Sequence, residues 1–162
     1  MSGIWLILEQ LPWAIAIREG AYLFPMIESV HVLAIALVVG TIMIVDLRLL
    51  GLPDREKAVR RLTADVLPYT WAFFGLAALT GGLMFISRAA VYAAAVPFQF
   101  KFVGLALAGL NMAVFQRFTF RSVDAWDRCT PPPFAAKLAG ALSLCVWLAV
   151  IVLGRWTGFV IL

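Results

Sequence analysis

Charged residues are scarce in this sequence, and their scarcity excludes an ordinary soluble domain. Asp, Glu, Lys and Arg make up 14% of the 162 residues, and hydrophobic residues make up 64%. Soluble domains average about 25% and about 45–50% for the same two classes. A chain of this length has too little polar surface to enclose a soluble core, so we expect its outer surface to face lipid.

Signatures of catalysis and of metal binding are also missing. The chain has one histidine, His31, and its two cysteines, Cys129 and Cys145, form no CxxC pair. It has no HExxH motif, no glycine-rich phosphate loop and no recognisable Ser/His/Asp motif. We therefore expect neither a zinc site, nor a disulfide, nor an enzyme with an active site of its own.

Four apolar segments are long enough to cross a bilayer, which takes about 20 apolar residues in a helix. They predict a single membrane domain, residues 1–162, with transmembrane helices over 22–46, 68–87, 99–118 and 134–154. The predicted fold class is all-α integral membrane, a four-transmembrane-helix bundle.

The first twenty residues are apolar but too interrupted to cross the bilayer. Glu9, Gln10 and Pro12 break the run, while Trp5 and Trp13 suit the headgroup level of a membrane. We expect residues 1–20 to form an N-terminal interfacial helix that lies on the membrane.

Basic residues are distributed unequally between the two sides of this bundle. Nine of the 13 lysines and arginines lie in or beside the loops that follow the first and third spans: Arg48, Arg55, Lys57, Arg60, Arg61, Arg117, Arg121, Arg128 and Lys137. Positive charge in short loops marks the cytoplasmic side. The distribution predicts a multi-pass membrane protein with both termini outside the cytoplasm.

The same distribution accounts for the net charge of +4 without a nucleic-acid partner. The expected partners are the lipid bilayer and either further copies of the chain, in a homo-oligomer, or other membrane subunits. Small residues such as Gly40, Gly75, Gly82 and Gly140 recur within the predicted spans. Close backbone contact at small residues is what usually joins helices in lipid, so this spacing predicts one tight bundle.

Three ionisable residues lie in the 22–46 helix, where each costs about 2.5–3.5 kcal/mol at the bilayer centre. Glu28 and His31 are three residues apart, and Asp46 is eighteen residues beyond Glu28, about five turns at about 3.6 residues per turn. The three therefore form a polar stripe that is expected to face the bundle, with Glu28 and His31 near the outer surface and Asp46 at the inner end.

Basic partners for these acids are present at both ends of the bundle. Lys101 and Arg155 are expected at the outer surface, within reach of Glu28. At the inner end, the candidates for pairing with Asp46 are Arg48, Arg117 and Arg121. Such pairs either build a polar site or only neutralise helix ends, and the sequence leaves both readings open.

Three interpretations compete for His31. It is a neutral hydrogen-bonding residue, or an axial ligand of haem b with Lys101 and Arg155 available for the propionates, or a metal-touching or proton-relay pair with Glu28. One histidine cannot supply both axial ligands of a haem, so the second would come from Met26, Met84, a solvent molecule or a neighbouring subunit's His31.

Two further kinds of polar residue have structural interpretations. Asn111, in the middle of the 99–118 helix, is expected to hydrogen-bond across helices. Trp71, Trp126, Trp147 and Trp156 mostly fall near the predicted membrane interfaces, which is typical of an interfacial belt and not of a ligand cage.

The segment ESVHVLAIALVVGTIMIVDLRLLG, residues 28–51, resembles a family of uncharacterised small bacterial inner-membrane proteins, a four-helix domain of unknown function. The likeness extends through residues 80–92, 97–111 and 154–156, and its most specific part is the ExxH…DLRLLG pattern. The resemblance implies a four-helix membrane bundle but no activity. The residues that match its motifs are Glu28, His31, Asp46, Arg48, Lys101, Asn111, Arg155 and Trp156.

Two classes of function follow from these observations. The first is a small membrane subunit with an outer-side polar site that binds haem or another small ligand through His31. The second is a non-catalytic structural or accessory subunit of a larger membrane assembly.

The predicted orientation can be tested by labelling single cysteines in intact cells. With Cys129 and Cys145 replaced by serine, a cysteine at position 60 should resist a membrane-impermeant maleimide until the cells are lysed. A cysteine at position 2 should react at once, because it is expected outside. Ready labelling of position 60 in intact cells would contradict the orientation.

Overall fold

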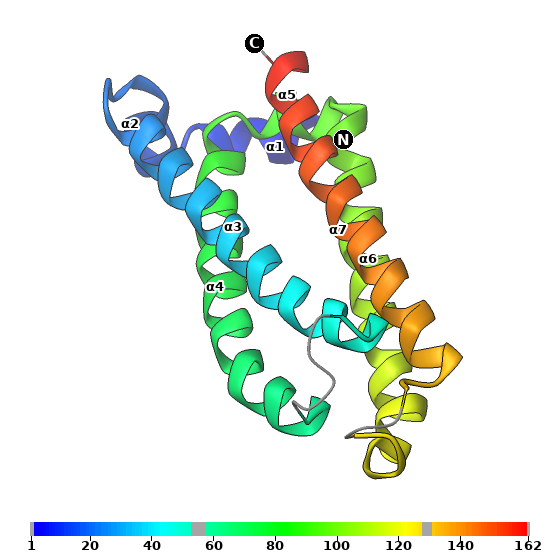
Figure 1. Cartoon of the computed structure of the whole chain (residues 1–162). Helices are drawn as coiled ribbons and strands as arrows, with labels where there is room; N and C mark the ends of the chain where they lie inside the picture. The colour runs from blue at the N-terminus through cyan, green and yellow to red at the C-terminus, as the bar shows by residue number, and fades with distance from the viewer. Residues whose placement is uncertain (1, 53–57, 128–130, 162) are drawn as a thin grey trace.

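In the computed structural model, residues 2–52, 58–127 and 131–161 are described, and their regular structure is helical throughout (Figure 1). In chain order the elements are α1 (Ser2–Glu9), α2 (Pro12–Glu19), α3 (Leu23–Leu50), α4 (Val59–Ser87), α5 (Ala89–Ala94), α6 (Val96–Val114), the π-helical η1 (Phe115–Thr119), the 3₁₀-helical η2 (Phe120–Ala125) and α7 (Phe134–Val160).

Four helical segments are long and apolar enough to cross a membrane, as the composition predicts. They are Leu23–Leu50, Val59–Ser87, Val96–Ala125 and Phe134–Val160, with mean hydropathies between 1.5 and 2.4. Large apolar side chains such as Leu33, Leu79 and Leu148 are exposed on their outer faces. The predicted fold class is confirmed: the protein is an all-helical, multi-pass membrane protein.

The segment between the first two spans is more helical than we predicted. The helix expected over 22–46 continues to Leu50, and the one expected from residue 68 begins at Val59, so Pro68 lies inside α4. The end of α3 is set by Gly51, whose φ of 88° is left-handed and whose N–H donates to the Arg48 carbonyl. Glycine accepts this conformation without strain, which makes it the usual residue just after a helix.

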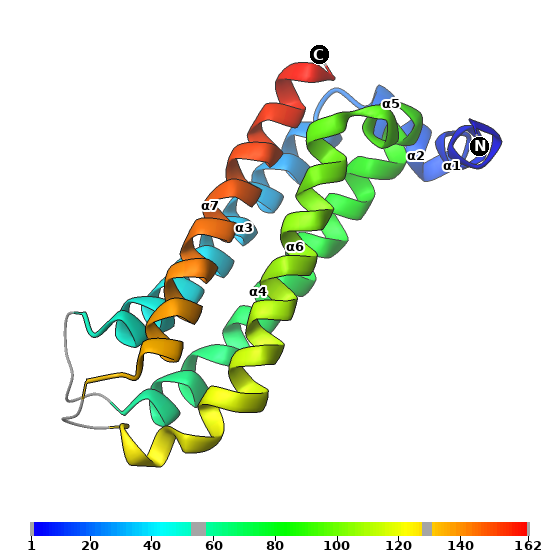
Figure 2. The same ribbon diagram turned by 90° about the vertical axis from the view of Figure 1, so that its right-hand side faces the viewer.

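The four long helices form two antiparallel pairs that are joined along one side. α3 packs against α4, α6 packs against α7, and α3 also packs against α7. Figure 1 shows α3 and α7 close together where α3 ends and α7 begins, which we call the loop end of the bundle. The two helices are well separated at the opposite end, the terminal end, where both chain termini lie. The two pairs therefore diverge from one crossing point, and Figure 2 shows the α6–α7 pair in front of the α3–α4 pair.

That crossing point is at Gly140 in α7. A Cβ atom at Gly140 would lie 2.9 Å from the Asp46 carbonyl oxygen and 3.2 Å from the Leu49 Cβ, which leaves no room for a side chain. Gly140 thus has the role that the small-residue spacing predicts. Gly40, Gly75 and Gly82, by contrast, have no atom of the described chain within 4 Å of such a Cβ, so they are not close-approach points within this chain.

The main hydrophobic core lies just beyond the crossing, at the loop end. It consists of Leu49, Val59, Phe115, Val123, Trp126 and Ala136. Two polar contacts close this end: Arg48 Nη2 donates to the Asp127 carbonyl oxygen at 2.9 Å, and the Arg60 backbone N–H donates to Asp127 Oδ1 at 3.0 Å. The second contact satisfies one of the free N–H groups at the start of α4. Trp126, which we predicted as a belt residue, is instead buried in this core.

The first twenty residues form two short helices instead of the single interfacial helix we predicted, because Pro12 starts a new helix. Both lie across the terminal end of the bundle (Figure 1), and neither is among the four candidate spans. Glu9 Oε1 accepts a hydrogen bond from the Ala90 N–H at 2.8 Å, and Arg18 Nη1 donates to the Ser87 carbonyl at 3.2 Å. The two helices are therefore held at the junction of α4 and α5.

The role of Gly140 can be tested against a second glycine of the same helix. Gly140→Ala should lower the free energy of unfolding in detergent by about 1–3 kcal/mol, the usual range for overpacking, because the new methyl group meets the α3 backbone. Gly158→Ala should be neutral or slightly stabilising, since nothing lies within 4 Å of its Cβ position. Thermal unfolding measures both; equal stability of the two variants would contradict the crossing.

Candidate functional site

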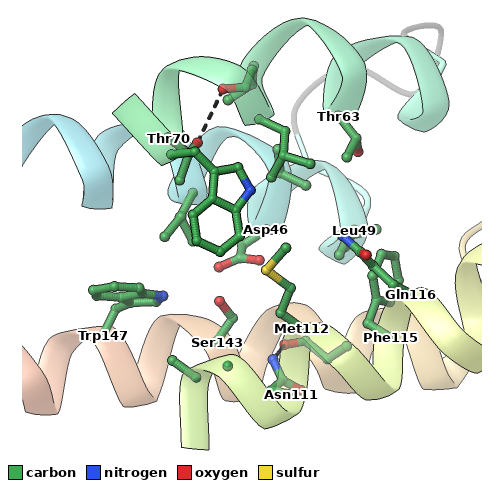
Figure 3. Close-up of a pocket in the computed structure, with 18 of the residues that line it drawn as sticks. Asp46, Leu49, Thr63, Thr70, Asn111, Met112, Phe115, Gln116, Ser143 and Trp147 are labelled. Carbon is green, nitrogen blue, oxygen red and sulfur yellow. Dashed lines mark hydrogen bonds between the residues drawn. The ribbon is translucent and has the colours of Figure 1, made fainter. Parts of the chain in front are cut away.

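A cavity of about 590 Å³ lies between α3, α4, α6 and α7, next to the crossing point. Figure 3 shows the side chains that line it. Most of the wall is apolar, for example Val38, Leu67, Phe74, Leu105 and Met112. A few polar groups interrupt this surface, which is the usual make-up of a small-molecule site.

Asp46 is the polar centre of the cavity. It comes from the last turns of α3 and is 5% exposed. In Figure 3 its carboxyl points into the cavity, with the Ser143 hydroxyl of α7 facing it. Among the residues that the structure describes, none donates a hydrogen bond to Asp46 Oδ2. An unpartnered carboxyl oxygen is expensive to bury away from water, and this one is directed toward the cavity.

The predicted ion pairs of Asp46 are not formed. In the described part of the chain no ion pair includes this carboxyl. Arg48 donates to the Asp127 carbonyl instead, and Arg117 and Arg121 are exposed. The prediction was wrong because it placed these residues at one membrane depth without knowing their direction. Arg48 follows Asp46 by only two positions, and residues two apart on a helix do not share a face.

Two other polar residues of the cavity, Asn111 and Thr70, form hydrogen bonds to neighbouring helices. Asn111 Nδ2 donates to the Ala139 carbonyl of α7 at 2.9 Å, which confirms its predicted role in joining helices. Thr70 Oγ1 donates to Thr41 Oγ1 at 3.0 Å and so links α4 to α3. Thr63 differs from them, since its buried hydroxyl oxygen has no partner in the described chain.

Aromatic residues contribute much of the wall, and the sequence reading missed this. Trp71 and Trp147, which we predicted as belt residues, both line the cavity, together with Phe74, Phe115 and Phe120. Position along a helix does not distinguish a tryptophan at the lipid interface from one that points inward at the same depth. No signal in the sequence separates the two cases.

The helix that carries several of these residues changes its winding beside the cavity. α6 ends at Val114 and continues as a π-helical turn, Phe115–Thr119, followed by 3₁₀ helix. Phe115 and Gln116, at the start of the π turn, line the cavity. π turns inside helices are frequently found at functional sites.

The cavity is least covered on the side between α4 and α6. Both helices line it, yet α4 packs on α3 and α6 on α7, with no comparable packing of α4 against α6. Arg60, at the start of α4, also lines the cavity and is ion-paired with the exposed Asp124 at 2.9 Å. Its guanidinium carbon lies 5.9 Å from the centre of the Phe120 ring.

His31 lies nearer the terminal end and faces α4. Its Nδ1 is 2.9 Å from Thr80 Oγ1, and the Thr80 hydroxyl is itself 2.7 Å from the Leu76 carbonyl oxygen. A hydroxyl has one proton to donate. If that proton is donated to Leu76, the bond to Thr80 requires a proton on Nδ1, which leaves the lone pair on Nε2; this assignment is inferred from the hydrogen-bond network.

The ring of His31 also lies against the backbone of α4. A Cβ at Gly81 would be 2.9 Å from the His31 Cε1, so this glycine makes room for the imidazole. No cluster of three or more His, Cys, Asp or Glu side chains suited to a metal ion occurs within residues 2–52, 58–127 and 131–161. His31 therefore has an ordered hydrogen-bond partner but no neighbouring protein ligands.

Of the other predicted outer-side residues, Lys101 lies close enough to His31 for its charge to act on the imidazole, whereas Glu28 and Arg155 are exposed. Glu28 is exposed and lies at a shallow surface depression with Val32 and Leu33. Its expected ion pairs with Lys101 or Arg155 are absent from the described structure. Glu28 has the same angular position as Asp46, but α3 and α7 diverge toward this end (Figure 1), so the face that is buried at Asp46 is uncovered at Glu28.

The remaining members of the predicted set lie on α6 and α7. Lys101 packs against α7, where a Cβ at Gly154 would be 3.5 Å from its Nζ. Arg155 is exposed, with its guanidinium carbon 4.9 Å from the centre of the Phe159 ring. Trp156 is exposed on the same helix, a position compatible with a membrane-facing side chain.

Residues 14–160 match the family model of DUF6644, a family of unknown function. The match covers most of the chain and confirms the predicted resemblance to a family without an assigned activity. Neither the curated proteins nor the solved structures include a match to this chain.

Proposed function

Because this chain belongs to the DUF6644 family, whose function is unknown, we propose its function from the cavity: the protein binds an apolar small molecule beside Asp46. One observation carries the proposal, a cavity of about 590 Å³ with apolar walls and an unpartnered, buried carboxyl oxygen. Sites for small molecules range over about 300–1,000 Å³ and combine an apolar lining with a few polar groups.

The energetics of packing favour this reading over an accidental void. Protein interiors are close-packed, and the cost of a cavity rises with its volume. Here the cavity also contains Asp46, whose burial without a partner adds a further cost. A ligand that fills the space and contacts the carboxyl offsets both costs.

We further propose that the cavity lies in the cytoplasmic half of a bacterial inner membrane, with both chain termini outside the cytoplasm. The supporting observation is the distribution of charge. Most of the basic residues that the structure describes are on the helix ends at the cavity's end of the bundle, and the termini are at the opposite end (Figure 1). Positive charge in short loops favours the cytoplasmic side.

A second candidate function is binding of haem b through His31. It is supported by the hydrogen bond between His31 Nδ1 and Thr80. With the proton on Nδ1, the lone pair of Nε2 is free to bind a metal, as in many metal-binding histidines. In this scheme Lys101 and Arg155 would contact the propionates, Glu28 would lie at the outer edge of the site, and the second ligand would be Met26, Met84 or a neighbouring subunit's His31.

The large exposed apolar surface also supports the alternative of a non-catalytic accessory subunit, in a homo-oligomer or with other membrane subunits.

The cavity proposal predicts that an uncharged apolar probe binds in the cavity and is excluded by a larger side chain that fills it. The neutral alcohol 4-phenylbutan-1-ol should raise the midpoint of thermal unfolding of the purified protein, because a ligand at about 100 times its Kd stabilises by about 2.7 kcal/mol. Ala108→Phe should abolish the shift by filling the cavity, since Ala108 lines it.

Ala106→Phe is the matched control, because it adds the same ring to the exposed face of the same helix. This variant should keep the shift of the wild-type protein. Equal shifts in Ala106→Phe and Ala108→Phe would mean that the alcohol acts on the detergent or on the outer surface, and would contradict binding in the cavity.

The haem candidate predicts an absorption spectrum. Protein purified from haem-replete cells should show a Soret band that shifts on reduction, and His31→Gln should remove it, since the chain has no other histidine. A colourless wild-type preparation whose unfolding matches that of His31→Gln would eliminate this candidate and leave the cavity proposal untouched.

A further inference from the structure

We propose that the natural ligand of the cavity is a lipophilic amine, held as an ammonium ion against the carboxylate of Asp46. This inference rests on the proposed function and adds the chemical class of the ligand. It also assigns the direction of access, from the lipid bilayer through the side between α4 and α6.

The first argument is the charge that the cavity lacks. Asp46 is 5% exposed, and within the described residues its Oδ2 accepts no hydrogen bond and its carboxylate joins no ion pair. Ser143, the polar residue that faces it across the cavity, is uncharged (Figure 3). Buried carboxylates normally have a cationic partner. An ammonium group supplies both the opposite charge and the hydrogen-bond donor, and such charge-assisted bonds are the stronger kind.

The second argument is the absence of a competing cation at that place. Of the described residues that line the cavity, Arg60 is the one base, and its guanidinium is paired with Asp124 at the exposed start of α4. Arg48, two positions after Asp46, donates to the Asp127 carbonyl beyond the core. The positive charges near the cavity are therefore directed toward its periphery.

The third argument is the aromatic wall. Trp71 and Trp147 both line the cavity, and Figure 3 shows Trp147 on the same helix as Ser143, which faces Asp46. Indole faces attract ammonium groups, and tryptophan is the best aromatic partner for a cation. The remaining wall is aliphatic or phenyl, which suits the apolar part of the same molecule.

The route of access requires the ligand to be lipophilic. Leu49 and Phe115 belong both to the cavity lining and to the hydrophobic core at the loop end. The core therefore forms the floor of the cavity at the loop end. The least covered side faces the bilayer, between α4 and α6, so a molecule that partitions into lipid reaches Asp46 without crossing the core.

Two probes with one skeleton test the inference: 4-phenylbutylamine, which is protonated at neutral pH, and the uncharged 4-phenylbutan-1-ol. Binding to the full-length protein in detergent is measured by titration calorimetry. A hydrogen bond to a charged group corresponds to roughly tenfold or more in affinity, so the amine should bind the wild-type protein at least about tenfold more tightly than the alcohol.

Asp46→Asn should remove that preference by weakening the amine about tenfold or more, while the affinity for the alcohol stays within about twofold. The matched control is Asp65→Asn, which removes the same charge from an exposed acid of α4 that does not line the cavity. It should change neither affinity. Ethanolamine, an amine without an apolar part, should not displace 4-phenylbutylamine.

Equal wild-type affinities for the amine and the alcohol would overturn the inference, and this comparison needs no variant to fold. A preference for the amine that survives Asp46→Asn, or is lost in Asp65→Asn, would also overturn it, as would displacement by ethanolamine. In each case binding of the alcohol that is sensitive to Ala108→Phe keeps the proposed function. Failure of both probes to bind would overturn the inference and the proposed function together.

Discussion

The close approach of α3 and α7 at Gly140 determines the shape of this protein. The glycine lets the Asp46 carbonyl lie where a side chain would otherwise be, and no other packing joins the α3–α4 pair to the α6–α7 pair to a similar extent in the described structure. Because the two pairs meet at one point near the loops, they diverge toward the terminal end (Figure 1). Lipid gives helices little reason to associate except such contacts, so the position of one glycine sets the geometry of the bundle.

The cavity follows from that crossing. α3 contacts α7, whereas α4 and α6 do not pack closely on each other, so a space remains between α4 and α6. Aromatic residues line this space without filling it. The crossing also brings the last turns of α3 into this space, which buries Asp46 among apolar groups. The core at Leu49 and Trp126 and the contacts of Asp127 then close the loop end next to the polar centre of the cavity.

The two ionisable groups on the inward side of α3, His31 and Asp46, have different surroundings. His31 has a defined hydrogen-bond partner in Thr80 and a glycine beneath its ring, so its environment is largely complete within the chain. Asp46 has a neutral neighbour, a cavity in front of it and an oxygen without a partner. Asp46 is therefore the better candidate for a functional residue, because an ionisable group inside a membrane is costly and commonly marks a functional site.

Hydropathy and helix periodicity determined the four spans, the non-spanning N-terminus and the cross-helix bond of Asn111, because these depend on local composition and on one polar side chain in an apolar helix. Tertiary structure alone decided which residues share a site. Glu28 and Asp46 have equal angular positions on α3, yet only Asp46 is covered, because helices cross at an angle and one face meets different neighbours along its length. Trp71 and Trp147 likewise line the cavity, and Trp71 is also 54% exposed. Position along a span encodes depth, but the partner helix sets the direction in which a side chain points.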